Sequence, residues 1–255
     1  MALYIGVVSH GHGNIIKELN IVNDLSFSHT VVVKSNKKDP CLNEYLEKGS
    51  SILIDSNYGK GFGSNNNEIF DYCVNVLNMK DDDHFLVLNP DVSITKDQLD
   101  SLLQLLISNN ISLGTIDLYN DFEFTIRDNS VRKFPKLIDF ISSFVLGINN
   151  TIIDRTEISS KEIGKAHKFD WAAGSFLVFT ASHYKQLRGF DEDYFMYCED
   201  IDICLRSKNL GEGLHYLPDV RAVHLSANAS RNIFSKNFLW HIKSIVRYLY
   251  ISMRL

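Results

Sequence analysis

A few carboxylates, amides and histidines of this chain stand directly after apolar segments, and the first of these groups suits the binding of a cation. The apolar run 85–88 ends abruptly in Asn89-Pro90-Asp91. Hard cations such as Mg²⁺ take oxygen ligands and are often held by one or two carboxylates together with phosphate oxygens. Asp91 therefore predicts a site where a divalent cation links the protein to a phosphorylated ligand. A simple turn is the alternative interpretation, because Asn, Pro and Asp all favour turns.

Three acids, Glu199, Asp200 and Asp202, follow the bulky run 194–197 (Tyr-Phe-Met-Tyr) and fall in the first turn of a predicted helix. The helix dipole favours acids at this position, so capping is one explanation. The neighbouring aromatic side chains suggest another. An acid that they partly enclose could act as a general base and remove a proton from a hydroxyl group.

A loop rich in glycine and asparagine, 57–67, follows the third predicted strand and contains Gly61 and Asn66. Glycines let the backbone approach a ligand closely, and amide side chains at the start of a helix lie near free backbone N–H groups. A dinucleotide-binding fingerprint would instead place GxGxxG between the first strand and its helix. The loop therefore disfavours a dehydrogenase, and an ordinary surface loop remains an alternative.

His224 stands at the end of another apolar segment, 220–223. A lone histidine more often has a structural role. Together with Asp91, however, it is a candidate metal ligand, because neutral imidazole is the commonest nitrogen donor to metals.

The elements that must position these residues can be read from the hydrophobic pattern. Strands are predicted at 3–9, 30–34, 51–55 and 85–88, and helices at 14–23, 65–79 and 96–109. The second half predicts strands over 111–127, an apolar helix over 134–146, an apolar segment at 169–180, a helix at 201–210, two short strands over 214–225 and a helix over 233–255. Strand–helix alternation predicts an α/β fold with a mostly parallel central sheet flanked by helices. Ligands of such sheets bind beyond the carboxyl ends of the strands.

The bulk composition excludes several classes of protein. The hydrophobic share of 45% is ordinary for a globular domain, and the formal charge of −5 disfavours a nucleic-acid binder. Four cysteines without CxxC spacing predict reduced thiols in the cytoplasm. The first apolar run has no basic segment before it, and no run approaches the roughly 18 apolar residues that a membrane-spanning helix needs. Neither a signal peptide nor a spanning helix is expected.

The last residues, 231–255, are basic and contain no acid, although the chain is acidic overall. Apolar and aromatic residues fill the spaces between the charges, which predicts a basic amphipathic helix that can lie on an anionic bilayer. A helix packed on the domain, with its basic residues in solvent, is the alternative. A second basic cluster could contact lipid or an acceptor diphosphate. The two sets are Arg231, Lys236, Lys243, Arg247 and Arg254, and Arg127, Arg132, Lys133 and Lys136.

Taken in order, these segments resemble glycosyltransferase family 2, the inverting enzymes of the GT-A fold, over nearly the whole chain. Four runs resemble its bacterial rhamnosyltransferases of O-antigen, lipopolysaccharide and related polysaccharide assembly: 131–135 (VRKFP), 169–176 (FDWAAGSF), 194–202 (YFMYCEDID) and 241–244 (HIKS). The resemblance implies a GT-A domain over 1–230, divided into a nucleotide-binding half 1–110 and an acceptor-binding half 111–230. It also implies a membrane-proximal helix over 231–255.

The resemblance implies a role for each matching residue. Asp91 and His224 would hold Mg²⁺ or Mn²⁺, and Asp200 would be the catalytic base, with Glu199 as the alternative. The nucleotide sugar would be bound by Ser9, Asn36, Gly61, Asn66, Asn89 and Asp91. The acceptor would be bound by Trp171, Gly174, Ser175 and Arg132. Two positions depart from the family pattern, because Asn89 replaces the first acid of the metal motif and Ser35 stands where many relatives have an acid.

The implied reaction is a single displacement, in which an acceptor hydroxyl attacks the anomeric carbon opposite the diphosphate. The expected donor is dTDP-L-rhamnose, and the expected acceptor is a lipid-linked, undecaprenyl-diphosphate sugar at the inner face of the bacterial plasma membrane. A UDP-hexose donor is the main alternative. A non-catalytic sugar-nucleotide-binding module is disfavoured because the chain keeps Asp91, Asp200 and His224 together. A nucleotidyltransferase is disfavoured because residues 9–13 contain no Lys or Arg.

Overall fold

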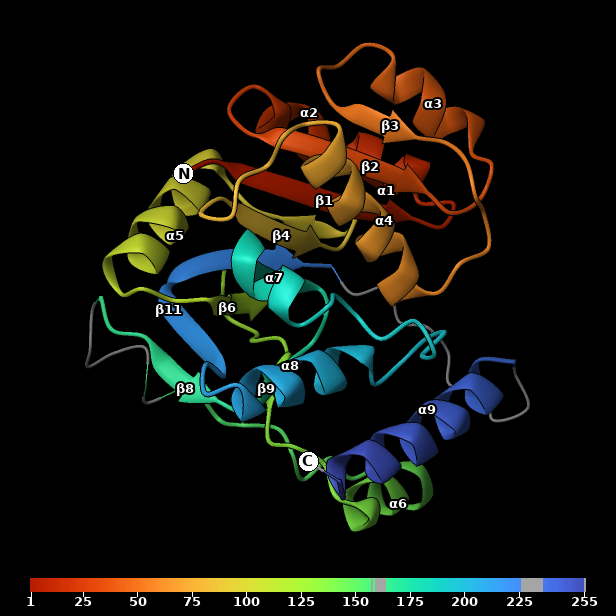
Figure 1. Ribbon diagram of the computed structural model, residues 1–255, viewed down its shortest axis with the longest axis vertical. Coiled ribbons are helices and arrows are strands. Elements are labelled where there is room, and N and C mark those ends of the chain that lie inside the picture. Colours follow the sequence, from red (N-terminus) through yellow and green to blue (C-terminus); the bar gives the residue numbers. More distant parts are fainter. Residues whose placement is uncertain (157, 159–163, 226–235, 255) are drawn as a thin grey trace.

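The computed structural model describes residues 1–156, 158, 164–225 and 236–254, and it centres on a nine-stranded sheet (Figure 1). Within these residues the strand order is β3-β2-β1-β4-β10-β6-β11-β5, with β8 paired to β11, while β7 and β9 form a separate ribbon. The strands are β1 (Leu3–Ser9), β2 (Thr30–Ser35), β3 (Ile52–Ile54), β4 (His84–Leu88), β5 (Val92–Ser93), β6 (Leu113–Tyr119), β7 (Val131–Arg132), β8 (His167–Phe169), β9 (Trp171–Ala172), β10 (Phe176–Thr180) and β11 (Leu214–His224).

Most strands of the sheet run in one direction. β1 pairs in parallel with β2 and β4, and β2 with β3. β10 is antiparallel to both β4 and β6, so β6 and its parallel neighbour β11 share the direction of β1. The mostly parallel sheet predicted from the sequence is therefore confirmed. Its register sets Ser9 opposite Ser35 and Val7 opposite Leu88, so these strands end at one common edge.

Helices cover both faces of the sheet, and two hydrophobic cores result. α1, α2, α3 and α5 pack on one face, whereas α4, α7, α8 and α9 pack on the other. Along β1, Leu3, Ile5 and Val7 belong to the first core and Tyr4 to the second, as the alternation of side chains along a strand requires. The helices are α1 (Gly13–Leu19), α2 (Ile21–Ser26), α3 (Pro40–Leu46), α4 (Phe62–Asn75), α5 (Lys96–Ser108), α6 (Leu137–Val145), α7 (Ala181–Gln186), α8 (Glu199–Asn209) and α9 (Lys236–Ser252).

Local sequence explains where several helices begin and end. Asp39 accepts a hydrogen bond from the backbone N–H of Leu42 (3.2 Å), and Pro40 occupies the first turn, so α3 starts there. Thr95 caps α5 in the same way. Asn20 adopts a left-handed conformation with φ 51°, which ends α1. The single helix predicted over 14–23 is therefore two helices.

The second half departs from the prediction in two places. Within 111–127 only β6 is a strand, because the carboxylate of Asp121 accepts hydrogen bonds from the backbone N–H groups of Thr125 and Ile126 and closes a turn. The two short strands predicted over 214–225 are one strand, β11, whose pairing with β6 shifts between Leu217 and Arg221. Proline at 218 lacks the N–H that regular pairing needs. The pattern also missed α3, α7 and β8.

The C-terminal helix α9 packs on the domain beside α6 (Figure 1). Ile245 and Tyr248 are buried in the second core, and Arg247 forms ion pairs with Asp191 and Asp193. The predicted boundary at 230, together with Arg231, lies outside the described residues. None of the helices that the structure describes is long and apolar enough to cross a membrane. All four cysteines are free thiols, as predicted.

Candidate active site

The shared edge of the parallel strands brings the two predicted metal ligands together. Asp91 follows β4, and His224 ends β11. The backbone N–H of Leu225 donates to the carbonyl of Asp91 (3.0 Å), and His224 pairs with Val92 of β5. This pairing sets His224 Nε2 at 3.4 Å from Asp91 Oδ1.

A third residue, Asp128, holds the other side of the imidazole. His224 Nδ1 lies 2.8 Å from Asp128 Oδ2. Burial alone would lower the pKa of His224, but hydrogen bonds to Asp128 and Asp91 raise it to about 9. Burial tends to raise the pKa of Asp91, and the nearby His224 outweighs this and lowers it. The carboxylate–histidine–carboxylate arrangement fixes the orientation of the ring.

This arrangement fits a divalent cation. Asp91 Oδ1 is buried and faces His224 Nε2, so it offers an anionic oxygen beside that ring nitrogen. A carboxylate behind the second ring nitrogen is the usual support of a metal-binding histidine. The described residues contain no cluster of three or more acidic, histidine or cysteine side chains that could hold a metal. Two protein ligands are sufficient where a diphosphate supplies further oxygens.

Asp128 was missed by the sequence analysis, as were its neighbours. Arg155, which is 3% exposed, donates to the backbone carbonyl of Asp128 and pairs with Asp117 of β6. Asp117 is fully buried and also accepts a hydrogen bond from Arg127 Nε (3.0 Å). Arg127, predicted to contact lipid or an acceptor diphosphate, is therefore engaged inside the protein. No spacing in the sequence links Asp128 to His224, since they meet only through the sheet.

Ser9 and Asn36, both predicted to bind the nucleotide, lie at the ends of β1 and β2 and are buried. Ser9 Oγ accepts a hydrogen bond from the backbone N–H of His12 (3.1 Å). The Asn36 amide bonds to both backbone groups of Lys60, donating to its carbonyl (2.8 Å) and accepting from its N–H (2.9 Å). Asn36 thus fastens the loop 57–67 to the sheet edge.

Gly61 and Asn66 occupy the start of α4, where they face other parts of the protein. A side chain at Gly61 would collide with the backbone of Phe195, with the Phe195 carbonyl 2.4 Å from the added Cβ. The next residue, Phe62, donates its backbone N–H to that carbonyl (3.1 Å). Asn66 is buried and donates to the carbonyl of Phe62 (3.0 Å). The loop 57–67 therefore rests against the run 194–197 that precedes the acids.

The two candidate bases, Glu199 and Asp200, lie at the start of α8 in different surroundings. Glu199 is 5% exposed, and its Oε2 has no hydrogen-bond partner. Burial, reinforced by the charge of Asp200, raises the pKa of Glu199 far above its usual value. Asp200 is partly exposed. Its carboxylate accepts hydrogen bonds from the backbone N–H groups of Gly174 (3.1 Å) and Ile201 (2.9 Å).

Burial also raises the pKa of Asp200, but these N–H groups and the charge of Arg132 oppose it. The pKa of Asp200 is still raised overall, and its carboxylate is held by the hydrogen bonds from Gly174 and Ile201. A larger residue would not fit at Gly174, because an added Cβ would lie 2.9 Å from the ring of Phe62. The close approach allows the backbone of Gly174 to reach Asp200.

Of the predicted acceptor residues, Gly174 and Arg132 act on the carboxylate of Asp200. Arg132 lies over the ring of Trp171, 5.5 Å from its centroid, and Trp171 Nε1 donates to the carbonyl of Lys133 (2.9 Å). Ser175 is buried, and its hydroxyl has no hydrogen-bond partner. The carbonyl of Ser175 accepts the backbone N–H of Asn89 (3.0 Å). The segment 173–176 thus joins the Asn89-Pro90-Asp91 turn to Asp200.

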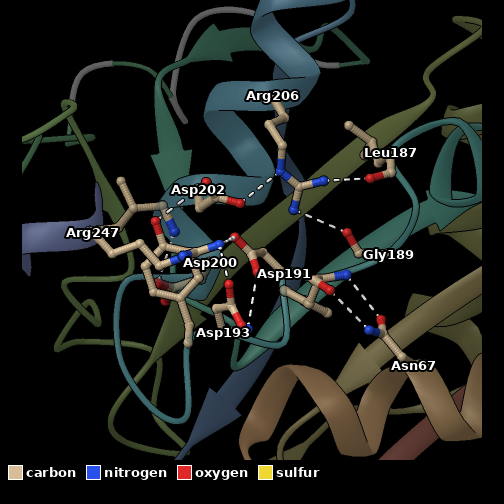
Figure 2. A network of polar contacts seen from close by, with 12 residues as sticks. Asn67, Leu187, Gly189, Asp191, Asp193, Asp200, Asp202, Arg206 and Arg247 are labelled. Carbon is tan, nitrogen blue, oxygen red and sulfur yellow. Dashed lines mark hydrogen bonds and ion pairs between the residues drawn. The ribbon is translucent and has the colours of Figure 1, made fainter. Parts of the chain in front are cut away.

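A polar network holds α8 in place (Figure 2). Asp202 is fully buried and pairs with Arg206 one turn later (2.7 Å). Arg206 also donates to the carbonyls of Leu187 and Gly189. Figure 2 shows Arg247 of α9 reaching Asp191 and Asp193 beside this network. Asp202 is therefore a structural acid, unlike its neighbours.

Comparison with known proteins decides the family of the chain. No protein-family model matches the chain. Over 97% of its length, however, it is 40% identical to rhamnosyltransferase WbbL of Escherichia coli, and it covers 92% of that protein. The chain belongs to the rhamnosyltransferases of glycosyltransferase family 2. This glycosyltransferase is also 30% identical, over 66% of its length, to N-acetylglucosaminyl-diphospho-decaprenol L-rhamnosyltransferase of Mycobacterium tuberculosis, and covers 55% of that protein.

Solved structures confirm the fold. Mannosyltransferase PcManGT from Pyrobaculum calidifontis, in complex with GDP-Man and Mn²⁺, superimposes with a TM-score of 0.62 at 14% identity. The match covers 99% of this glycosyltransferase and 64% of that chain. The fold is thus the GT-A fold that the sequence predicts.

Replacement of Arg206 tests the network that holds α8. In Arg206→Met, the buried charge of Asp202 loses its partner, so we expect the free energy of unfolding to fall by about 3–5 kcal/mol. The matched control is Lys208→Met, because Lys208 forms an exposed ion pair with Asp170 and its loss costs less than about 1 kcal/mol. Urea denaturation measures both. Equal losses in the two variants would show that Asp202 is not held by Arg206.

Glu199 predicts a pH dependence of stability. Its pKa is raised in the folded protein, so above the ordinary value of 4.5 the folded chain binds a proton that the unfolded chain releases. Stability then falls as pH rises from 4.5 toward the folded-state pKa. Glu199→Gln imitates the protonated acid and should become progressively more stable than the unchanged protein over this range. Denaturation at several pH values measures the difference, and parallel curves would contradict a protonated Glu199.

Proposed function

We propose that this glycosyltransferase transfers L-rhamnose from dTDP-L-rhamnose, with inversion, to an undecaprenyl-diphosphate-linked sugar. The observation that carries the proposal is the 40% identity to a rhamnosyltransferase over almost the whole chain. The name of the mycobacterial relative supports an acceptor sugar linked to a polyprenyl diphosphate. The proposed site comprises a donor half, 1–110, and an acceptor half, 111–230. The protein would act in the cytoplasm, on the inner face of the bacterial plasma membrane.

On the donor side, Asp91 and His224 would hold Mg²⁺ or Mn²⁺, with Asp128 orienting the imidazole. The bound cation would offset the charge that develops on the departing diphosphate. Asn89 lacks the charge of an acid, so Asp91 supplies the carboxylate of this turn. Ser9, Asn36, Gly61 and Asn66 would line the nucleotide side, mainly by fixing the backbone of the loop 57–67.

On the acceptor side, Asp200 would be the general base. Its carboxylate takes the proton of the acceptor hydroxyl, the hydroxyl oxygen bonds to the anomeric carbon, and the bond from that carbon to the diphosphate breaks. Glu199 is unsuited to this role because burial raises its pKa far above the usual value and its Oε2 has no hydrogen-bond partner. The N–H of Gly174 holds Asp200 in position. Trp171, Ser175 and Arg132 would form the surface against which the acceptor sugar lies.

Replacement of Asp200 tests this assignment. In Asp200→Asn we expect turnover to fall by about 10²–10⁴-fold, the usual contribution of a general base, while dTDP binding and folding stay nearly intact. Glu199→Gln is the matched control, because a protonated acid and an amide are similar, and its turnover should fall far less. Product formation from dTDP-L-rhamnose and a polyprenyl-diphosphate sugar measures both. Unchanged turnover in Asp200→Asn would exclude it as the base.

Nucleotide binding tests the donor side. Calorimetry with dTDP, UDP and GDP, each with and without Mn²⁺, should show the tightest, metal-dependent binding for dTDP.

Replacement of Asp128 tests its support of the metal site. In Asp128→Asn we expect the affinity for Mn²⁺ in the presence of dTDP to fall about 10–100-fold, as for other carboxylates that hydrogen-bond to a metal-binding histidine. The exposed Asp82→Asn is the control. A preference for UDP would move the donor to a UDP-hexose, and an unchanged Mn²⁺ affinity would contradict the role of Asp128.

A further inference from the structure

The outward face of α9 carries a row of apolar residues. Ser244, Ile245 and Tyr248 are buried toward the domain. On the opposite side, large apolar residues recur at helical spacing along the whole helix and are 40–79% exposed. These residues, here called the α9 row, are Leu239, Ile242, Val246, Tyr250 and Met253.

The neighbouring helix α6 is more unusual, because it has no buried residue at all. Its exposed apolar residues also share one face, and Val145 is 74% exposed. Helices of globular proteins normally bury their apolar face. Packing within the domain therefore does not account for the exposed apolar face of α6. These residues, here called the α6 row, are Leu137, Ile138, Ile141 and Val145.

The two rows form one surface. Phe140 of α6 contacts Tyr248, with ring centroids 6.1 Å apart, and Phe144 contacts Phe238 at 5.6 Å, so the helices are antiparallel. Successive residues of a helix are rotated by about 100° about its axis. On this measure the α6 row and the α9 row are each rotated by roughly a quarter-turn from the residues through which the two helices contact each other. The direction of this rotation, viewed from the N-terminus of each helix, is the same for both. In an antiparallel pair, this equal rotation places both rows on the same side.

The charges around the surface point to its occupant. Lys133 and Lys136 are exposed where α6 begins, and Lys243 and Arg254 are exposed along α9. Residues 231–255 contain no acid. Asp139 of α6 is only partly exposed and accepts the backbone N–H of Lys136. A basic border around an apolar face is complementary to anionic lipid.

A second copy of this chain would suit the surface less well. A symmetric contact places the same patch of both copies together, and here it would bring basic residues against basic residues. Contiguous apolar surfaces of this kind are uncommon on proteins that remain in water.

We propose that the α6 and α9 rows together form a membrane-docking surface that enters the interface of an anionic bilayer. The two helices lie in the plane of the interface, with apolar side chains among the lipid tails and basic side chains at the head groups. α6 is thus a principal membrane contact in its own right, and docking does not depend on the basic residues of α9 alone.

The docking surface is coupled directly to the site. Trp240 of α9 packs on Phe195, with centroids 4.4 Å apart, and His241 stacks on Tyr197 at 4.5 Å. Ser244 Oγ donates to the carbonyl of Met196 (2.8 Å). The run 194–197 leads straight into α8, where Glu199 and Asp200 lie. On the proposed function, docking brings an acceptor anchored in the bilayer to the side of the protein that carries the base.

Flotation with lipid vesicles tests the surface without donor or acceptor, so its outcome is independent of the proposed reaction. The protein should float with vesicles of phosphatidylglycerol and phosphatidylcholine, and bind phosphatidylcholine alone more weakly. The triple variant Ile138→Ser, Ile141→Ser, Val145→Ser should bind at least about tenfold more weakly, and so should Leu239→Ser, Val246→Ser, Tyr250→Ser. These side chains are exposed, so the variants should fold, and an unchanged midpoint of urea denaturation verifies it.

The matched control removes exposed apolar residues elsewhere: Phe27→Ser, Val76→Ser, Ile107→Ser, each at least 48% exposed in the unchanged protein. The control should float like the unchanged protein. Three results would overturn the proposal: no flotation of the unchanged protein, an equal loss in the control, or full binding by the α6 variant. A dimer in light scattering that either row variant converts to a monomer would instead assign the surface to a second copy.

Discussion

The common direction of β1, β2, β4, β6 and β11 is the constraint on which the site depends. Parallel strands end at one edge of a sheet, so polar residues that follow them must meet there. Asp91 and His224 come together in this way, and β5 completes the contact by pairing with the end of β11. The contact between Asp91 and His224 therefore requires no local sequence motif that contains both residues. It needs only strands of matched length, each followed by the right side chain.

Two adjacent acids in α8 have the same kind of side-chain group but different surroundings. Glu199 and Asp200 share a helix start, yet the former is enclosed without a partner for Oε2 and the latter receives two backbone N–H groups. Burial favours the neutral form of the first, and hydrogen bonds favour the anion of the second. Arg206 of α8 donates to the backbone carbonyls of Leu187 and Gly189, and these bonds hold α8, with both acids, in position.

The run 194–197 connects the functions of the molecule. It receives α9 on one side through ring contacts and the loop 57–67 on the other through Gly61 and Phe62. The loop 57–67 and the helix α9 of the proposed membrane surface therefore contact one short segment that precedes Asp200. This arrangement gives a physical route by which docking and donor binding can each affect the position of Asp200.

The sequence alone determined the α/β class and the four N-terminal strands, because strand-length apolar runs are local features, and its resemblance to glycosyltransferase family 2 predicted the GT-A fold. It also singled out Asp91, His224 and Asp200. It could not find Asp128, whose contact with His224 exists only after β6 and β11 pair. Nor could it show that Asn36 bonds to the loop 57–67 and that Gly61 lets this loop approach Phe195. For α9 it left open a helix on a bilayer and a helix packed on the domain, whereas the structure packs α9 against the domain and α6 and leaves an apolar row exposed. Which face of a helix is covered is decided by its neighbours, and only the tertiary structure supplies them.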